Sequence, residues 1–158
     1  MGAIGKEKRR ALSNRYRGAL RNNMNRIYLA ACFEQQAEVR DKAIELEKLG
    51  FICTSSWRFE DGNIPPTSAH LDKCAKQDLT DLRNANYFVC LTSQASQRGG
   101  KHVEFGYALA LDIPCLLVGR RENIFHSLTR VDFVETWNEA LDLLLSWQEK
   151  VKAITEAV

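Results

Sequence analysis

YFVCLTSQASQRGGKHVEFGYALA, residues 87–110, is the stretch that decides the fold of this chain. It begins with an apolar run of strand character at 87–91 and continues through a polar loop at 92–98 and a glycine pair. A helical pattern follows over 101–111. A strand, a glycine-rich turn and a helix in this order are typical of a ligand site at the carboxyl end of a parallel strand.

Glu104 lies in the first turns of that helical pattern. The free N–H groups and the dipole at a helix start favour anions, so we expect this carboxylate to be ionised. An ionised carboxylate at the mouth of a cleft can act as a nucleophile. The alternative is that Glu104 only complements the helix dipole at the surface.

The composition is that of one globular domain. The chain has 158 residues, of which 45% are hydrophobic and 27% charged. No apolar run is long enough for a bilayer span, and the basic start lacks the apolar region of a secretory signal. Five cysteines without a CxxC pair favour reduced thiols in a cytoplasmic protein and give no reason to expect a structural zinc site: Cys32, Cys53, Cys74, Cys90 and Cys115.

Charge is distributed unevenly along the chain. Residues 1–26 hold eight Lys or Arg and one acid, a charge of +7, whereas the remainder carries −5. We therefore divide the chain into a basic N-terminal extension, 1–25, and a single α/β domain, 26–158. The extension is either a solvated arm or a contact for nucleic acid, and the small total charge of +2 favours the solvated arm.

Apolar strands alternate with amphipathic helices along the rest of the chain. Strands are expected at 26–31, 51–55, 87–91, 113–119 and 131–134, and helices at 34–49, 68–82, 101–111 and 136–152, with one connection not clearly helical. This alternation predicts a parallel α/β sandwich that binds its ligand at the carboxyl ends of the strands.

Two further polar residues should converge on that edge. Asp78 falls within the apolar stripe of the helix 68–82, where a carboxylate is costly unless it has partners or borders a cavity. It would otherwise lie at the edge of the stripe and cap a neighbouring loop. Tyr28 lies on the first strand. The chain contains no dinucleotide fingerprint, phosphate loop or nucleophile elbow.

Three blocks of sequence, in order, carry a resemblance to a known family. They are IYLAACF at 27–33, QDL at 77–79 with NANY at 84–87, and GGKHVEFGYA at 99–108. Together they resemble the nucleoside 2-deoxyribosyltransferase family, which includes deoxyribonucleoside 5′-monophosphate N-glycosidases. The resemblance covers about residues 26–134 and leaves out the basic extension.

The resemblance implies a flavodoxin-like three-layer sandwich with a five-stranded parallel sheet in the order 2-1-3-4-5. It implies cleavage of the N-glycosidic bond of a 2′-deoxynucleoside or its monophosphate, with no cofactor. Glu104 matches the family's nucleophile, Asp78 the carboxylate that orients the sugar or base, and Tyr28 the tyrosine that positions the nucleophile or sugar. It also implies a homodimer or larger homo-oligomer, in which 123–128 reaches a neighbouring subunit's site through His126 and Ser127.

Further substrate contacts are expected around the loops. Cys32 is expected to contact the substrate, and Phe33 and Trp57 would stack on the base, or else belong to the core. Family members that act on nucleotides tend to carry Gly-Ser after the first strand, where this chain has Ala31-Cys32, and this puts phosphate binding there in doubt. Ser93 and Gly100, from the loop after the third strand and the start of the next helix, are further candidates for substrate binding. Ser96, Arg98 and Lys101 would hold a 5′-phosphate, or else belong to a solvated polar loop.

Some alternatives stay open at this point. His102 is either a proton donor or an exposed or interfacial residue. The protein is either this enzyme, a nucleotide-binding or sensing module without turnover, or a glycohydrolase acting on another ribosyl compound such as NAD. The residues do not show which base the substrate carries or whether the substrate is a nucleoside or a nucleotide. They also do not show whether the acceptor is water or a second base.

Overall fold

The computed structural model describes residues 25–95 and 97–157 and, before them, Glu7, Arg10, Ala11, Asn14 and 17–19. Five parallel strands form one sheet in the order β2-β1-β3-β4-β5. The expected parallel sandwich and its strand order are therefore confirmed. Most of the expected extension, 1–25, lies outside the described residues. Of its described part, Gly18 donates to the Asp112 carbonyl and Ala19 is buried, so this portion packs on the domain.

The elements follow the expected alternation. The strands are β1 (Arg26–Ala30), β2 (Ile52–Cys53), β3 (Tyr87–Leu91), β4 (Cys115–Val118) and β5 (Val131–Val134). The helices are α2 (Gln36–Lys48), α3 (Ser68–Arg83), α4 (Gly100–Ala110) and α5 (Trp137–Glu156), with 3-10 turns η2 (Phe33–Gln35), η3 (Ser56–Phe59) and η4 (Ile124–Ser127). The connection between β4 and β5 carries only η4, so the expectation of one non-helical crossover is confirmed.

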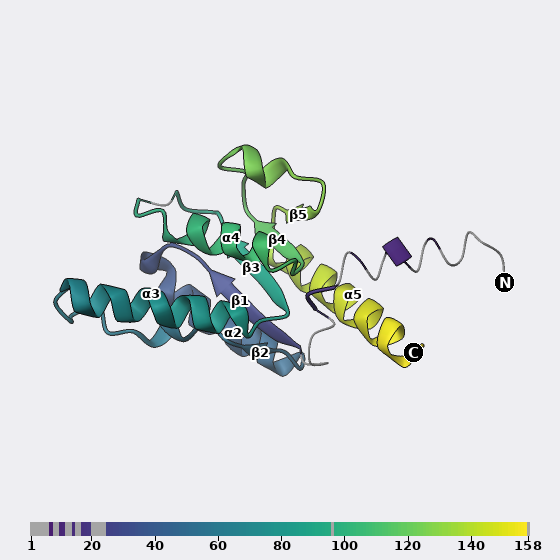
Figure 1. Cartoon of the computed structure of the whole chain (residues 1–158), viewed down its shortest axis with the longest axis horizontal. Coiled ribbons are helices and arrows are strands. Elements are labelled where there is room, and N and C mark those ends of the chain that lie inside the picture. The colour runs from purple at the N-terminus through teal and green to yellow at the C-terminus, as the bar shows by residue number, and fades with distance from the viewer. Residues whose placement is uncertain are drawn as a thin grey trace.

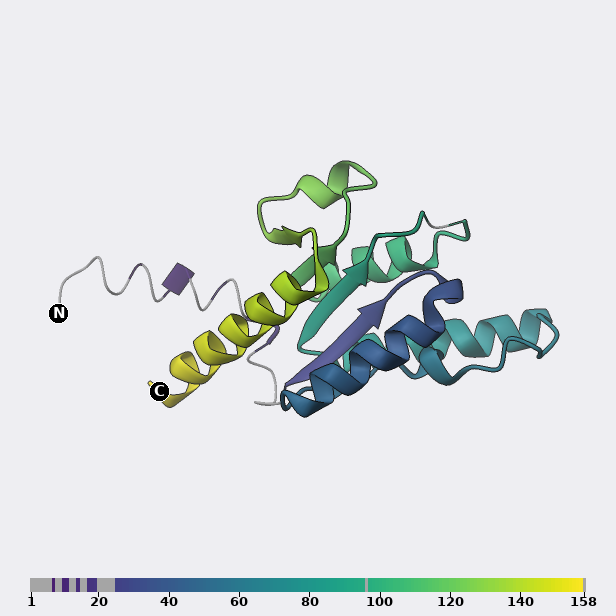
Figure 2. The ribbon, with the colours of Figure 1, turned by 180° about the vertical axis from the view of Figure 1, so that it is seen from behind.

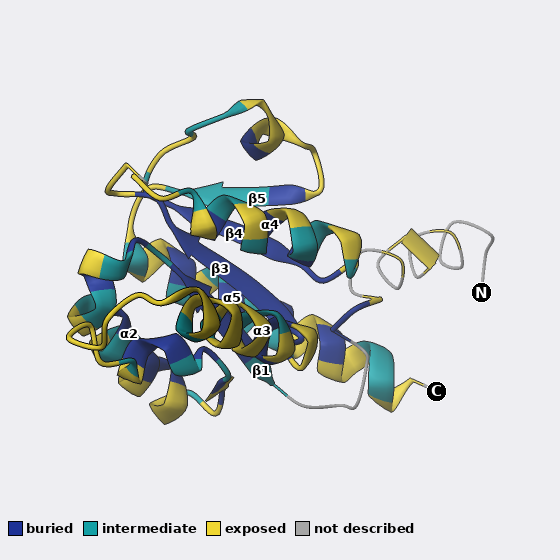
Figure 3. Cartoon of the chain, turned by 60° about the vertical axis from the view of Figure 1, so that its left-hand side comes forward, coloured by how far each residue is buried: buried dark blue, intermediate teal, exposed yellow. Residues whose placement is uncertain are grey.

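The helices form two layers around the sheet. Figure 1 shows α3 and α4 in front of the strands, and the reverse view in Figure 2 shows α2 and α5 on the other face. β3 and β4 are buried along their length, as Figure 3 shows, because helices cover both of their faces. The core thus lies on both sides of the central strands.

Local chemistry sets where the helices begin. Thr67 accepts the His70 N–H at the start of α3, and Thr136 with Glu139 forms a capping box at the start of α5. Gly99 precedes α4 with a φ of 75°, a left-handed conformation that glycine adopts without strain. This turn directs the chain from β3 into α4.

The segment between β4 and β5 rises away from the body of the domain in Figures 1 and 2. It starts at Gly119, whose φ is 127° and where a Cβ would lie 2.8 Å from the Ser93 nitrogen. The neighbouring Thr92 hydroxyl donates to Val118 and accepts from Arg120 N–H. The ends of β3 and β4 are therefore locked together beside the predicted ligand edge.

All five cysteines are free thiols, four of them buried, as expected. Among the helices in the described part of the chain, none combines the length and apolar character that a bilayer span requires.

Candidate active site

A cavity of about 280 Å³ opens where β1 and β3 end. The strand order reverses between these two strands, which is where open parallel sheets bind ligands. Its walls come from the ends of β1 and β3, from η3 and from helices α3 and α4. They comprise Ala31, Cys32, Phe33, Glu34, Trp57, Glu60, Leu71, Asp78, Gln97, Arg98, Gly100, Lys101 and Glu104.

Glu104 lines this cavity and is held by Tyr28. The buried Tyr28 hydroxyl donates to Glu104 Oε1 over 2.9 Å, which joins β1 to α4. The pKa of Glu104 is raised to about 8, chiefly by burial and also by the Asp78 carboxylate, and the Tyr28 hydrogen bond opposes this rise. The expectation that the helix dipole keeps this group ionised is therefore wrong. Glu104 is the fifth residue of α4, and the dipole's influence fades within the first turn.

Asp78 supplies a second carboxyl group to the cavity. Burial raises its pKa to about 7, with help from the negative charges of Glu60 and Asp81. Its Oδ1 atom is buried and accepts no hydrogen bond from the described residues. The alternative that Asp78 caps a neighbouring loop is wrong, because Asp81 does so by accepting the N–H and hydroxyl of Ser56. Asp78 is thus left facing the cavity with an unused acceptor.

Glu60 is a third carboxylate in the cavity and was not predicted from the sequence. It follows η3 directly, and its charge raises the pKa of both Asp78 and Glu104. The only signal in the sequence is that Glu60 follows the second expected strand, 51–55, and so lies beyond the carboxyl end of a parallel strand. Nothing in the spacing of the polar loop 58–67 marks it out.

Aromatic side chains also line the cavity. The rings of Phe33 and Trp57 lie 6.4 Å apart at 38°, and the Trp57 Nε1–H donates to the Leu29 carbonyl over 2.9 Å. Trp57 is therefore fixed to β1 while it lines the cavity together with Cys32. The cavity places these three predicted residues together, and stacking on a base stays a prediction.

The loop between β3 and α4 behaves only partly as expected. Arg98 and Gly100 line the cavity. Ser93 is not among the lining residues and accepts a hydrogen bond from Gln35 over 3.1 Å. Ser96 lies outside the described residues.

Lys101 lines the cavity, but its ammonium group is already paired with another residue. It is 2% exposed, and its Nζ lies 2.8 Å from the Gln94 carbonyl and 3.0 Å from Glu122 Oε1. The expectation that Lys101 holds a phosphate is therefore wrong, because a buried carboxylate already neutralises its ammonium group.

In the segment 123–128, His126 does not lie where it was expected, at the surface facing a neighbouring subunit. This ring is 1% exposed, packs edge-on against Phe105 at 5.1 Å and accepts the Glu122 N–H over 3.0 Å. Burial inside its own chain rules it out as a contact to a neighbouring subunit in this conformation. Ser127 is exposed and lies apart from the cavity. The segment instead exposes large apolar side chains that were not predicted: Ile124, Phe125 and Leu128.

His102, Glu122 and His126 bring three potential metal-ligand atoms within 4.8 Å of one another. Because His126 Nδ1 accepts a backbone N–H, the proton of the neutral ring is on Nε2, and neither nitrogen keeps a free lone pair. Lys101 already neutralises Glu122. These contacts fit an ion-pair network better than a metal site. His102 does not line the cavity, so the structure gives no support to its alternative role as proton donor.

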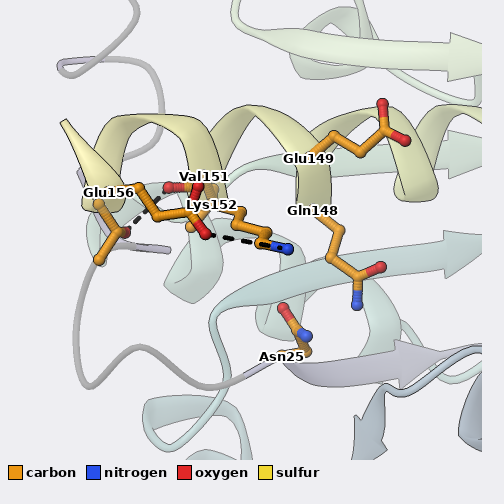
Figure 4. A pocket seen from close by; sticks show the side chains of 7 residues that line it. Asn25, Gln148, Glu149, Val151, Lys152 and Glu156 are labelled. Carbon is orange, nitrogen blue, oxygen red and sulfur yellow. Dashed lines mark hydrogen bonds and ion pairs between the residues drawn. The ribbon is translucent and has the colours of Figure 1, made fainter.

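A larger cavity, of about 540 Å³, runs along α5 and is shown in Figure 4. It is lined by Asn25, which precedes β1, and by polar residues of α5, including the ion-paired Lys152 and Glu156. It therefore lies near the amino end of β1, away from the carboxyl edge. It brings together no buried carboxylates of raised pKa, so the smaller cavity is the better candidate for chemistry.

No protein-family model matches this chain, and no relative is found among curated proteins. Among solved structures it is similar to a CMP N-glycosidase of Clostridium botulinum, BcmB, with a TM-score of 0.54 and 20% identity. That match covers 75% of this chain and 98% of the other. A conserved protein of Enterococcus faecalis V583 matches with a TM-score of 0.46 and 16% identity, over 85% and 99% of the two chains. At this level of identity, the likeness to the N-glycosidase establishes a shared fold.

Proposed function

We propose that this protein cleaves the N-glycosidic bond of 2′-deoxynucleosides or their 5′-monophosphates, with Glu104 as nucleophile. The observation that carries the proposal is the Glu104 carboxyl group, oriented by Tyr28 over 2.9 Å at a cavity that also holds Asp78. The resemblance of the sequence to deoxyribosyltransferases supports the same interpretation. So does the fold shared with an enzyme that acts on CMP.

The two carboxyl groups suit the two needs of the reaction. Cleavage builds positive charge on the sugar, and an ionised Glu104 attacks the anomeric carbon to form a glycosyl ester. As the carbon–nitrogen bond breaks, its electron pair passes to the base, which takes a proton from neutral Asp78. With pKa values of about 7 for Asp78 and about 8 for Glu104, the pair retains a proton at neutral pH. These values place that proton on Glu104 more often than on Asp78, so the reactive form, with ionised Glu104 and neutral Asp78, is the less populated of the two singly protonated forms.

The glycosyl ester is then resolved by an acceptor. Attack at the anomeric carbon by water, which gives its proton to the Asp78 carboxylate, releases deoxyribose or its 5-phosphate and makes the enzyme a hydrolase. Attack by a second base, which gives up a proton in the same way, makes it a transferase. In both cases the ester bond breaks and Glu104 leaves as a carboxylate. The Tyr28 hydroxyl, which donates to Oε1, stabilises that leaving carboxylate.

The test is product analysis with a panel of deoxynucleosides and monophosphates, with and without an acceptor base. Glu104→Gln should lower base release at least about 1000-fold, because the amide cannot form the ester. Glu149→Gln, in the larger cavity along α5, is the matched control and should keep wild-type rates. Full base release by Glu104→Gln would refute the mechanism.

Two other functions are separated by the same assay. A sensing module would give no product but would show ligand-induced thermal stabilisation. An enzyme acting on NAD would release nicotinamide. The cavity volume of about 280 Å³ lies just below the usual range for ligand sites, about 300–1,000 Å³, and this favours a nucleoside over a dinucleotide.

We also propose that the protein forms a homodimer or larger homo-oligomer through the segment between β4 and β5. Ile124, Phe125 and Leu128 are 80%, 58% and 40% exposed on a segment that projects from the body of the domain. Exposed apolar clusters of this kind mark interaction sites. Light scattering coupled to gel filtration should report a dimer or larger for the wild type and a smaller species for Phe125→Asp. A wild-type monomer would refute the proposal.

A further inference from the structure

His70 and Cys74 form a pair of potential metal ligands on helix α3. They lie one turn apart, a spacing at which a helix places two zinc ligands on one face. The Cys74 sulfur lies 3.5 Å from His70 Nε2. In a tetrahedral zinc site, with Zn–S of about 2.3 Å and Zn–N of about 2.0–2.1 Å, two such atoms are about 3.5 Å apart. The pair therefore already has the separation that a shared zinc ion requires.

This pair is turned toward the body of the domain. Of residues 68–77, all of which the structure describes, only His70 and Cys74 are partly buried, and the rest are exposed. Neither of the two lines the cavity, although Leu71 between them does. The pair therefore lies at the edge of the cavity, partly protected from solvent.

Glu60 supplies a carboxylate beside the pair. Partial burial raises the pKa of the Cys74 thiol, and the charge of Glu60 and a hydrogen bond to its side chain raise it further. The charge of Asp78 acts in the same direction, and Lys73 opposes it. A divalent cation gains from the same carboxylate that disfavours a bare thiolate.

The Glu60 side chain can reach a metal ion without any change in its backbone. That backbone is fixed, because the carbonyl accepts from Gln36 Nε2 over 2.8 Å and the N–H donates to the Trp57 carbonyl. The side chain has three rotatable bonds and is only partly buried. Its carboxylate can therefore turn from the Cys74 thiol to an ion held between Cys74 and His70.

We propose that His70, Cys74 and Glu60 bind a zinc ion at the edge of the cavity, with water in the fourth position. Imidazole, thiolate and carboxylate together suit zinc, which takes nitrogen, sulfur and oxygen ligands in a tetrahedral arrangement. Zinc replaces the thiol proton, which passes to solvent, and the carboxylate then contacts the metal. Because the ligands come from α3 and from the residue after η3, the ion connects two segments of the chain.

The experiment titrates chelator-treated, full-length protein with Zn²⁺ by calorimetry. One ion should bind per chain with a Kd of about 10 μM or lower. Zn²⁺ at about 100 times this Kd should raise Tm by about 4 °C or more. Co²⁺ should bind in its place and give the near-ultraviolet charge-transfer band of a cobalt–thiolate bond, which identifies sulfur as a ligand.

Variants test the three ligands. Cys74→Ser and His70→Gln should each weaken Zn²⁺ binding at least about tenfold, and Cys74→Ser should also abolish the cobalt–thiolate band. Glu60→Gln should weaken binding by a smaller factor, about threefold or more, because it replaces a charged oxygen ligand with a neutral one.

The control variant lies in the other cluster of potential ligands, His102, Glu122 and His126. His102→Gln should keep the wild-type Kd. Loss of binding in His102→Gln but not in Cys74→Ser would overturn the proposal and assign the ion to that cluster. Absence of binding to wild-type protein at about 1 mM Zn²⁺ would also overturn it. Binding that all three ligand variants retain would do the same, since it would mark an adventitious ion only.

The zinc site and the proposed function can fail separately. His70 and Cys74 lie outside the cavity lining, so zinc binding does not require glycosidic cleavage. Glu104→Gln, which should lack base release, should bind Zn²⁺ with the wild-type Kd. A wild-type protein that binds Zn²⁺ at these ligands but releases no base would support the site and overturn the function.

Discussion

Tyr28 connects the first strand of the sheet to the carboxyl group proposed as nucleophile. Its hydroxyl donates to Glu104 Oε1 over 2.9 Å, and this bond lowers a pKa that burial raises. Tyr28→Phe should therefore raise the pKa of Glu104 above about 8 and shift the ascending limb of the pH dependence of kcat/KM to higher pH. At pH 7 we expect kcat/KM to fall about 10- to 100-fold.

The control for this prediction is another tyrosine on the chain. The Tyr107 hydroxyl accepts from Arg83 and lies outside the cavity, so Tyr107→Phe should keep both the rate and the pH profile. A Tyr28→Phe enzyme whose rate falls without any shift of the ascending limb would assign Tyr28 to packing and not to the ionisation of Glu104.

At the residue scale, the sequence predicted which side chains meet but not their charge states. Periodicity was enough to direct Asp78 inward, and topology brought Tyr28 and Glu104 to the same edge. Ionisation depends on burial and on all neighbouring charges, which a linear pattern does not contain. Glu60 was missed for the same reason, because its place in the cavity follows from the path of a turn.

The Lys101–Glu122 ion pair ties helix α4 to the segment between β4 and β5. The two side chains are 0% and 12% exposed and lie 3.0 Å apart. Removing one partner leaves the other charge buried, so Lys101→Met and Glu122→Gln should each cost about 3–5 kcal/mol of unfolding free energy. The double variant should lose much less than the sum of the two, because it leaves no buried charge unpaired.

Urea denaturation measures these three variants and a matched exposed pair. Lys76 and Asp72 lie 2.6 Å apart on α3 but are 74% and 60% exposed, so Lys76→Met should change stability by under about 1 kcal/mol. Additive losses at Lys101 and Glu122 would mean that the two charges act independently.

Elements with strong periodicity were predictable and irregular segments were not. The expected strand 51–55 shrinks to two residues in β2, an edge strand on which Ile52 is 53% exposed. The segment between β4 and β5 was expected to direct His126 outward. Its conformation instead depends on tertiary contacts, since His126 packs on Phe105 and the apolar side chains beside it point to solvent.

On the scale of the whole molecule, one strand order accounts for the position of the candidate site. The order 2-1-3-4-5 sends the chain in opposite directions after β1 and after β3, so their loops separate and leave a crevice. The alternation of strands and helices predicts a parallel sandwich, and the resemblance to the deoxyribosyltransferase family implies this strand order. The volume of the crevice and its carboxylate-rich walls come from η3 and α3, whose placement depends on packing.

A cavity that holds ionisable groups in neutral form makes stability depend on pH. Carboxyl groups of the unfolded chain lose their protons near their ordinary pKa values of 3.8 for Asp and 4.5 for Glu, whereas Asp78 and Glu104 keep theirs up to about 7 and about 8. The folded state therefore binds extra protons in this interval, and its stability falls as pH rises through it. Ionisation of Asp78 or Glu104 during catalysis therefore lowers the stability of the folded state.

Between pH 6.5 and pH 8, the change in stability with pH comes mainly from the loss of protons by Asp78 and Glu104. The buried His126 has a lowered pKa, so its contribution to stability is complete above about 6.5. Glu38 and Glu139, whose hydrogen bonds lower their pKa, contribute fully at lower pH still. Burial raises the pKa of Cys53 and Cys115, so thiol ionisation in the unfolded chain matters only above about pH 8.

Thermal unfolding should therefore show Tm falling by about 3 °C or more between pH 6.5 and pH 8. Glu104→Gln should have a higher Tm than the wild type at pH 8 and a flatter pH dependence, because the amide has no proton to lose. Glu149→Gln should follow the wild-type curve. A wild-type Tm that stays constant or rises across this window would mean that Asp78 and Glu104 are both already ionised at pH 6.5. In that case the pair would hold no proton for the leaving base, and the acid would have to come from outside the cavity.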